Sequence, residues 1–271
     1  ATGYIGKNFV KKSKLKHLEK TSTKKLNNYI RFDMTKNKIE KIFKKKNIEN
    51  AIIFSAISNP DECEKNKKKS NLINVSSTIK IIKYLIKKKK YFIFFSTEYV
   101  YAGNLGNYSE RSKIGNSLLY AKQKIKVEEY LKKKNYKKFA IVRIAKTYGD
   151  KINDNTIFTN FLKKSSKKKI IKVAKDQFFS ALYINDLVKI LDIFINQTIT
   201  GLYNISGDEK ISRLEYLKKL KKKFKLDIEI IPKKFQFLSI NRNIPLNVTM
   251  NNNKIKTKIK FRFTKFNEYL N

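Results

Sequence analysis

Short apolar runs recur through the first 150 residues, and longer amphipathic segments separate them. The runs lack the polar alternation of half-exposed strands, which is typical of parallel strands buried on both faces. They are Tyr29–Phe32, Ala51–Phe54, Tyr91–Phe95 and Phe139–Ile144. Apolar residues three or four apart predict helices between the runs, over residues 35–46, 65–89 and 120–133. This alternation predicts an α/β fold with a doubly wound parallel sheet.

The regularity loosens past residue 150. Helices are expected over residues 154–166, 184–196 and 211–224, with a last one near Phe266. Two short strands are expected between them, at Ile170–Val173 and Gly201–Ile205. We therefore expect a main domain over residues 1–150 and a smaller C-terminal lobe over residues 151–271, interleaved with the main sheet.

The charge of the chain is extreme, because 63 Lys and Arg residues stand against 22 Asp and Glu residues, a net charge of +41. Such a charge suits a nucleic-acid partner. However, the lysines are spread over the whole chain, and several lysine runs end predicted helices, where cations suit the helix dipole. Lys is enriched together with Asn and Ile, as in A+T-rich genomes. We therefore expect attraction to anionic ligands but no specific nucleic-acid partner.

The remaining composition excludes several classes of protein. Cys63 is the one cysteine and His17 the one histidine, so neither an internal disulfide nor a site built on His and Cys is expected, and we predict no metal. No uncharged apolar run is long enough to span a bilayer, and no secretory signal opens the chain. A cytoplasmic protein without a membrane partner is the resulting prediction.

Candidate chemistry lies where the third apolar run ends. Ser96 and Thr97 follow Phe95, at the end of a strand where open α/β sheets place their ligands. Tyr120 and Lys124 are four apart in a predicted helix, so they share one face. A free phenol has a pKa of about 10, and a nearby ammonium group favours its ionised form. Together these side chains form a candidate proton-transfer set.

The chain opens on Ala1-Thr2-Gly3-Tyr4-Ile5-Gly6. Glycines three apart before a helix let the backbone approach a phosphate group. A full dinucleotide fingerprint needs a preceding strand and an earlier glycine, so we expect the first strand to be missing from this sequence. Hydroxyls and lysines in Thr21–Lys25 suit a 2′-phosphate, which favours NADP(H) over NAD(H), although a solvated basic loop is an equal alternative; Glu19 is the one nearby acid that would favour NAD(H).

In this order the residues resemble extended short-chain dehydrogenases/reductases, and most closely the dTDP-4-dehydrorhamnose reductase branch of sugar-nucleotide enzymes. Ser96–Gly103 is similar to that branch's Ser-Thr-Asp-Tyr-Val-Phe-x-Gly, and Phe32–Thr35 to its Leu-Asp-Ile-Thr. Pro245–Met250 resembles its C-terminal substrate-lobe motif, and the resemblance runs from residue 1 to about 270. It implies a Rossmann-like NAD(P)-binding domain over residues 1–150 and a substrate-binding lobe over residues 151–271.

The resemblance also implies roles for single residues. Tyr120 would donate a proton to the reduced carbonyl oxygen, Lys124 would lower the pKa of Tyr120 and hold the nicotinamide ribose, and Thr97 would hydrogen-bond the same oxygen. Further cofactor contacts would come from Gly3, Tyr4, Ile5, Gly6, Asp33, Met34, Ser55, Ala56 and Ile57. Substrate contacts would come from Glu98, Tyr99 and Arg242.

The sequence departs from this family mainly on the substrate side. Glu98 stands where the family has Asp, the segment Lys113–Leu119 just before Tyr120 lacks the family's proline, and Arg242 is displaced from the family's Arg-Pro pair, which reads Ile244-Pro245 here. Reductase chemistry is therefore better supported than the identity of the sugar.

The resulting prediction is an NAD(P)H-dependent reductase of a nucleotide-linked 4-keto sugar, in dTDP-rhamnose or related biosynthesis, with a homodimer as a possible assembly. One alternative is a sugar-nucleotide epimerase or dehydratase on the same scaffold, which would recycle its hydride. Another is a non-catalytic regulatory subunit, like the beta subunit of methionine adenosyltransferase. A basic nucleic-acid-binding protein is the weakest alternative and would bind with a steep salt dependence.

Overall fold

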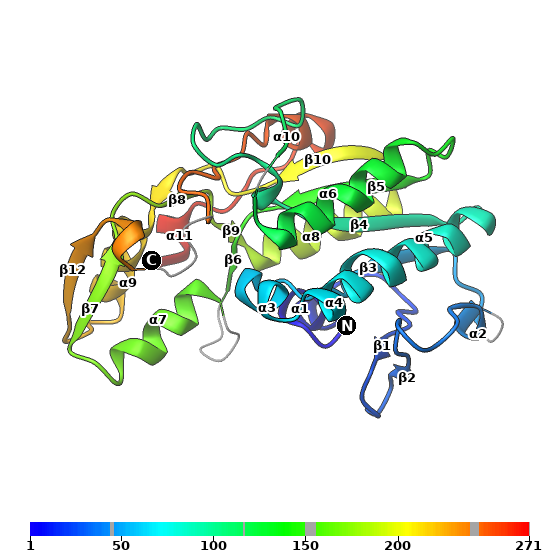
Figure 1. Ribbon diagram of the computed structural model, residues 1–271, viewed down its shortest axis with the longest axis horizontal. Coiled ribbons are helices and arrows are strands. Elements are labelled where there is room, and N and C mark those ends of the chain that lie inside the picture. Colours follow the sequence, from blue (N-terminus) through cyan, green and yellow to red (C-terminus); the bar gives the residue numbers. More distant parts are fainter. Residues whose placement is uncertain (44–45, 116, 150–155, 239–243, 271) are drawn as a thin grey trace.

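The computed structural model describes residues 1–43, 46–115, 117–149, 156–238 and 244–270 (Figure 1). Its central sheet contains four parallel strands in the spatial order β10-β5-β4-β3. Their bounds are Asn50–Ile53 for β3, Tyr91–Thr97 for β4, Phe139–Ile144 for β5 and Gly201–Ile205 for β10. Every residue of β4 is buried, as expected for a central parallel strand. The predicted α/β fold with a doubly wound parallel sheet is confirmed.

Helices cover both faces of this sheet, and the alternation of side chains along β4 explains why. Phe92 and Phe94 point to one face, where they pack with apolar residues of α5 and α6. Ile93 and Phe95 point to the other face, where they pack with α1 and α8. The helix bounds are Tyr4–Lys12 for α1, Thr78–Lys87 for α5, Leu119–Lys132 for α6 and Ile184–Asn196 for α8. The result is a three-layer arrangement with a core on each side of the sheet.

The predicted helix over residues 65–89 starts earlier and is interrupted. It consists of α3 (Pro60–Lys65), α4 (Lys67–Asn71), the π-helical segment η1 (Leu72–Ser77) and α5. The start is set by Asn59, whose side chain accepts hydrogen bonds from the backbone of Asp61 and Glu62, with Pro60 in the first helical position. The π-helical segment turns the buried Asn74 side chain toward the loop after β3, where it bonds both backbone groups of Ile57.

Two predictions for the N-terminal part are wrong. The helix expected over residues 35–46 is reduced to α2 (Glu40–Phe43) among the described residues, because Asp33 binds Thr35 in a local turn instead. The run Tyr29–Phe32, expected among the buried strands of the main sheet, contains β2 (Ile30–Arg31), which is not buried and pairs in parallel with β1 (Thr21–Ser22) in a separate two-stranded sheet.

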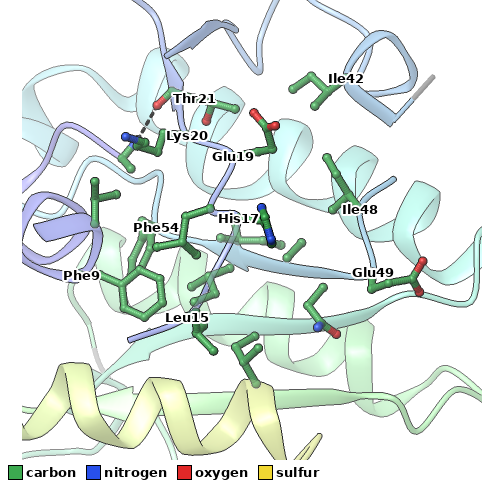
Figure 2. Close-up of a pocket in the computed structure, with 18 of the residues that line it drawn as sticks. Phe9, Leu15, His17, Glu19, Lys20, Thr21, Ile42, Ile48, Glu49 and Phe54 are labelled. Atoms are coloured by element: carbon green, nitrogen blue, oxygen red, sulfur yellow. Dashed lines mark hydrogen bonds between the residues drawn. The ribbon is translucent and has the colours of Figure 1, made fainter. Parts of the chain in front are cut away.

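A cavity of about 460 Å³ lies between this small strand pair and β3 (Figure 2). Apolar side chains such as Phe9, Leu15 and Phe54 line it together with His17 and Glu49. In the described part of the chain, β3 pairs only with β4, so the cavity runs along its other edge.

The C-terminal lobe has a small core of its own. Its elements are α7 (Ile157–Ser165), β7 (Ile170–Ala174), β8 (Phe178–Phe179), β11 (Ile211–Ser212), α9 (Arg213–Lys223), β12 (Glu229–Lys233), η3 (Phe235–Phe237) and α11 (Phe266–Leu270). β7 pairs with β12 in parallel, and β8 pairs with β11 in antiparallel orientation. Phe179, Tyr216 and Phe266 pack at its centre. The sequence of residues 211–224 is thus a short strand and a helix, rather than one helix.

Short elements join the lobe to the main sheet. β6 (Thr147–Tyr148) continues from β5 and pairs with β9 (Leu182–Tyr183), while α10 (Asn253–Ile259) packs against β10. Because α8 and β10 belong to the main sheet but lie between lobe elements in sequence, the two parts interleave. The division at residue 150 stays a prediction.

Candidate active site

The carboxyl end of β4 carries the first candidate residues. The strand ends at Thr97, and the 3₁₀ turn η2 (Glu98–Val100) follows immediately. The Thr97 hydroxyl accepts a hydrogen bond of 3.3 Å from the backbone N–H of Tyr99, so this residue caps the turn. β4 has a neighbour on each side, so this strand end lies at the middle of the sheet edge.

Tyr120 and Lys124 lie in the first two turns of α6 and face this strand end. The Tyr120 side chain makes a hydrogen bond with that of Thr97. The Lys124 ammonium donates to the carbonyl oxygen of Phe95 at 2.8 Å and lies 5.9 Å from the centre of the Tyr120 ring. All three side chains are buried. The structure therefore brings the predicted proton-transfer set together.

Burial controls the protonation of both groups. It raises the pKa of the Tyr120 phenol well above its ordinary value, and the hydrogen bond with Thr97 opposes this only in part. Burial also lowers the pKa of Lys124 to about 8, against the nearby Cys63 and Glu128. The net pKa of Tyr120 is therefore raised and not lowered as expected, because desolvation dominates and the Lys124 ammonium donates to Phe95. A phenol that keeps its proton at neutral pH suits a general acid.

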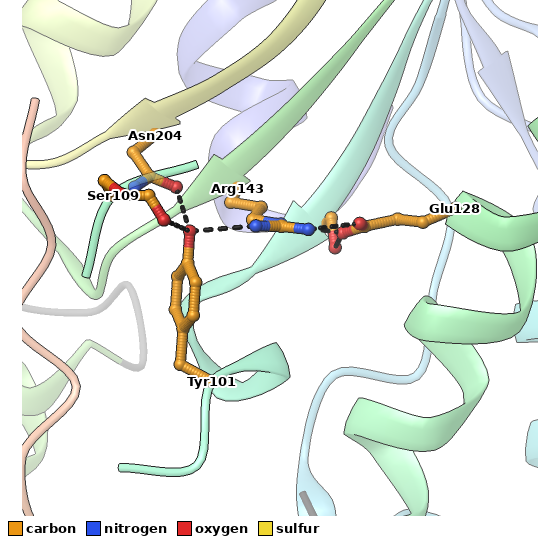
Figure 3. A network of polar contacts seen from close by, with 6 residues as sticks. Tyr101, Ser109, Glu128, Arg143 and Asn204 are labelled. Atoms are coloured by element: carbon orange, nitrogen blue, oxygen red, sulfur yellow. Dashed lines mark hydrogen bonds and ion pairs between the residues drawn. The ribbon is translucent and has the colours of Figure 1, made fainter. Parts of the chain in front are cut away.

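A buried polar network lies beside the end of β4 (Figure 3). Glu128, one turn after Lys124, accepts hydrogen bonds from Ser96 at 2.5 Å and from Arg143 at 3.0 and 2.6 Å. Arg143 also donates to the Tyr101 hydroxyl at 2.9 Å, and that hydroxyl donates to Asn204 at 2.7 Å. Burial acts to lower the pKa of Arg143, but Glu128 outweighs it and raises that pKa. The network ties β4, β5, β10 and α6 together.

A second ion pair lies beside the predicted residue Glu98. Its carboxylate is 2% exposed and contacts the Lys146 ammonium at 3.1 Å. That ammonium lies 4.7 Å from the centre of the Tyr99 ring and 5.6 Å from that of Phe179. Arg213, at the start of α9, interacts with Tyr99 and donates to the Gln177 side chain at 2.8 Å. Glu98 and Tyr99 therefore belong to a cluster of polar and aromatic groups.

Lys146 and Arg213 were not among the predicted site residues. Lys146 lies just after the end of β5, much as Thr97 lies at the end of β4. Its position directly after an apolar run could therefore have marked it as a candidate site residue. Arg213 carries no such signal, since only the fold of the lobe brings α9 against Tyr99.

The glycine turn lies at the start of α1. Gly3 is its N-cap, without a side-chain cap, and a Cβ built on Gly3 would meet no atom within 4 Å. The first N–H groups of a helix have no intrahelical acceptor, so this end has both donors and room for a phosphate group. Gly6 is needed for a different reason, because a Cβ there would lie 2.9 Å from Ala1. Tyr4 packs toward Gly149, and Ile5 packs on the core.

The other predicted cofactor residues are placed at two loops. The Asp33 carboxylate accepts from the backbone and hydroxyl of Thr35 at 2.9 and 2.6 Å, which lowers its pKa, and Met34 lies beside it in the chain. A cavity of about 330 Å³ there is lined by Thr23, Arg31, Asp33, Lys36 and Asn37. Ser55, Ala56 and Ile57 form the loop after β3. Arg242 lies outside the described residues.

The larger cavity of Figure 2 is separate from this chemistry. Neither Thr97, Tyr120 nor Lys124 lines it, although Ser55 at the end of β3 does. Within the described ranges, no three His, Cys, Asp or Glu side chains gather into a metal-binding group. None of the helices described is long and apolar enough to cross a membrane.

Comparison with known proteins adds a family and a set of folds. The family model described as "RmlD substrate binding domain" matches residues 1–271. A search of the curated proteins found no match.

Solved structures resemble the chain over nearly all of its length. A hypothetical dTDP-4-dehydrorhamnose reductase from Sulfolobus tokodaii is 21% identical with a TM-score of 0.84, over 99% of this chain and 96% of that one. A dTDP-4-dehydrorhamnose reductase from Bacillus anthracis in complex with NADP is 20% identical with a TM-score of 0.78, over 88% and 84%. A UDP-glucose 4-epimerase from Thermotoga maritima with UDP-glucose is 18% identical with a TM-score of 0.84, over 99% and 93%. At these identities the likeness shows the fold.

Proposed function

Because the chain belongs to the RmlD substrate binding domain family, we propose that it reduces a nucleotide-linked 4-keto sugar with NAD(P)H. The substrate is of the dTDP-4-dehydrorhamnose type that the names of two structural relatives give. The observation that carries the proposal is the meeting of Thr97, Tyr120 and Lys124 at the end of the central strand, with the Tyr120 pKa raised.

In the proposed reaction the substrate carbonyl lies against the Tyr120 hydroxyl. Tyr120 donates its proton to the oxygen as that oxygen becomes an alkoxide, and solvent later restores the proton. Thr97, already hydrogen-bonded to Tyr120, orients the same oxygen. Lys124 places a positive charge beside the phenol and stabilises the phenolate that remains. When bound, the nicotinamide cofactor supplies the hydride.

The residues present fit such a cofactor. The open N-terminus of α1 at Gly3 to Gly6, with Tyr4 and Ile5 between, suits the pyrophosphate. Asp33 and Met34 are assigned to the adenine end, and Ser55, Ala56 and Ile57 to the path toward the nicotinamide. Asn74 would keep this last loop in place, since it binds both backbone groups of Ile57 and also the Gln123 side chain of α6.

A preference for NADP(H) over NAD(H) is part of the proposal. Arg31 and Lys36 line the small cavity beside Asp33, and no acid other than Asp33 lines it. One Asp33 carboxylate oxygen, Oδ1, already accepts hydrogen bonds from the backbone N–H and the hydroxyl of Thr35. Two cations at this position suit a 2′-phosphate.

Replacement of Tyr120 by Phe tests the proposal. We expect kcat to fall by roughly 10²- to 10⁴-fold, because the proton donor is lost while the ring remains. The measurement is NADPH oxidation with a dTDP-4-keto sugar. Tyr130→Phe, on the same helix but outside the site, is the matched control and should leave the rate unchanged. An unchanged rate in Tyr120→Phe contradicts the assignment.

The likeness to the UDP-glucose 4-epimerase supports a second candidate function, that of a sugar-nucleotide epimerase or dehydratase. An epimerase or dehydratase would return its hydride to the product, so it would convert the sugar without net NADPH oxidation. Stoichiometric NADPH consumption therefore separates the two. A regulatory subunit would show no turnover at all, and the intact set of Thr97, Tyr120 and Lys124 argues against it. The homodimer and the cytoplasmic location stay predictions, and light scattering tests the first.

A further inference from the structure

The carboxylate of Glu98 is incompletely bonded, although it is almost fully buried. Its Oε1 contacts the Lys146 ammonium at 3.1 Å, and Lys146 also offers a backbone hydrogen bond. Its Oε2 is buried without a hydrogen-bond partner in the described part of the structure. Buried polar atoms in folded proteins nearly always have a partner, so this oxygen calls for an explanation.

The position of Glu98 points to a ligand as the missing partner. Glu98 follows Thr97 directly, and its charge acts on the Tyr120 phenol, so the carboxylate lies beside the reacting groups. Lys146 reaches it from just beyond β5 and remains 22% exposed, so the pair is not fully closed off from solvent. A ligand that placed a hydrogen-bond donor here would satisfy the free oxygen.

Lys146 fits the role of a fixed counter-ion. Its ammonium lies near the Tyr99 and Phe179 rings, at 4.7 and 5.6 Å from their centres, which limits its movement. Burial acts to lower the pKa of Lys146, but the charge of Glu98 outweighs it and raises that pKa. For Glu98, burial raises the pKa and Lys146 opposes the rise. Removal of Lys146 would therefore favour the neutral acid.

We propose that Lys146 is a positioning residue, which holds the Glu98 carboxylate so that its free oxygen accepts a hydrogen bond from a hydroxyl of the sugar ring. That hydroxyl lies on the ring near the carbonyl held by Tyr120 and Thr97. The inference rests on the proposed reductase function and adds a requirement for a hydroxylated sugar at this position.

The pH dependence follows from the groups that face Glu98 and Lys146. Glu98 faces the Lys146 ammonium and the phenol of Tyr120 from α6. Lys146 faces Glu98 and the phenol of Tyr99 from η2. Burial keeps the Tyr120 pKa high. When Lys146 is lost, Glu98 is protonated at low pH, and a proton on its free oxygen turns that oxygen from a hydrogen-bond acceptor into a donor; the carboxyl group recovers its charge as the pH rises.

The experiment measures KM for a dTDP-4-keto sugar between pH 6 and 9 in four variants. In Lys146→Met we expect KM to exceed the wild-type value by roughly 10- to 100-fold at pH 6, with the ratio falling as the pH rises. Glu98→Gln should raise KM by a similar factor at every pH, and Lys146→Arg should restore most of the affinity. Lys210→Met, which removes an exposed lysine near the Phe178 ring, is the matched control and should change nothing.

The outcomes separate this inference from the proposed function. If the wild type oxidises NADPH with the sugar but Lys146→Met has an unchanged KM, or a KM raised equally at every pH, the inference is wrong. If the wild type shows no turnover, calorimetric titration with dTDP-glucose and dTDP still tests the inference. In that case, a smaller difference in affinity between dTDP-glucose and dTDP in Lys146→Met than in the wild type, with recovery in Lys146→Arg, supports it, and an unchanged difference overturns it.

Discussion

Two buried ion pairs flank the end of β4, and they differ in how completely they are bonded. In the Arg143–Glu128 pair both side chains are at most 1% exposed, and both Glu128 oxygens accept hydrogen bonds. In the Lys146–Glu98 pair one carboxylate oxygen has no partner among the described residues. β5 supplies both cations, Arg143 from within the strand and Lys146 from just beyond its end. A saturated pair has no capacity left for a ligand, whereas the unsaturated pair does.

The difference has a physical cause in the position along the strand. Within the sheet every group must find a partner in the protein, because water cannot reach it, and an unpaired buried charge is costly. Beyond the strand end the groups face the open edge of the sheet, where a ligand can take the place of a protein partner. The first pair therefore serves the fold, and we assign the second to the substrate.

The largest expected effect is on the saturated pair. Glu128→Gln should lower the free energy of unfolding by about 3–5 kcal/mol, because it leaves the Arg143 guanidinium buried without its counter-charge. Chemical denaturation monitored by circular dichroism measures this. Glu98→Gln is the matched substitution at the other pair, and it should cost clearly less, since Lys146 is 22% exposed and can be hydrated when its counter-charge is removed.

Equal losses of stability in the two glutamine variants would break the comparison. It would be sharpened by the double variant Glu128→Leu/Arg143→Met. Replacement of a buried pair by apolar side chains is often neutral or stabilising, so this variant should recover most of the stability lost in Glu128→Gln.

A smaller effect is expected at the far end of the same network. Tyr101→Phe removes the hydroxyl that accepts from Arg143 and donates to Asn204. Arg143, Asn204 and the backbone carbonyl of Ser109 then lose a partner, so the free energy of unfolding should fall by about 1–3 kcal/mol. KM for the sugar should stay at the wild-type value, because the Tyr101 hydroxyl belongs to the network of the fully bonded Arg143–Glu128 pair. A raised KM with unchanged stability would reverse the assignment of the two pairs.

The smallest effect concerns Lys124, which lies on α6 between Tyr120 and Glu128. Burial lowers the pKa of Lys124 to about 8, so the ammonium loses its proton as the pH rises through 8. We therefore expect kcat to fall along the alkaline limb of its pH profile. The unfolded chain keeps this proton up to about 10.5, so the same group makes the free energy of unfolding rise between pH 8 and 10.5.

The pH profile of kcat measures the Lys124 limb. Lys124→Arg should retain less activity but lose the limb, since a guanidinium group does not titrate below pH 12. Lys126→Met, an exposed position on the same helix, should leave the profile unchanged. A wild-type profile that is flat to pH 9.5 would mean that the charge of Lys124 is not needed.

The sequence alone located three strands of the main sheet, β3, β4 and β5, and two catalytic candidates on one helical face, but it did not place β10 in that sheet. The runs at β3, β4 and β5 are apolar because both faces of these strands are buried, and such runs can be read without knowledge of their neighbours. Tyr120 and Lys124 share a helical face by spacing alone, and the resemblance to a family linked them to Thr97. The sequence placed the predicted helix over residues 35–46 poorly, because a local turn at Asp33 overrode its periodicity.

Only the tertiary structure decided how those groups are charged and what else they meet. The pKa of Tyr120 is set by its burial under neighbouring elements, which no local spacing reveals. Glu128 joins Arg143 across 15 positions, Lys146 joins Glu98 across 48, and Arg213 meets Tyr99 only because the lobe folds back on the sheet. Helical and strand periods extend over a few residues, whereas desolvation and long-range pairing depend on the packing of the whole chain.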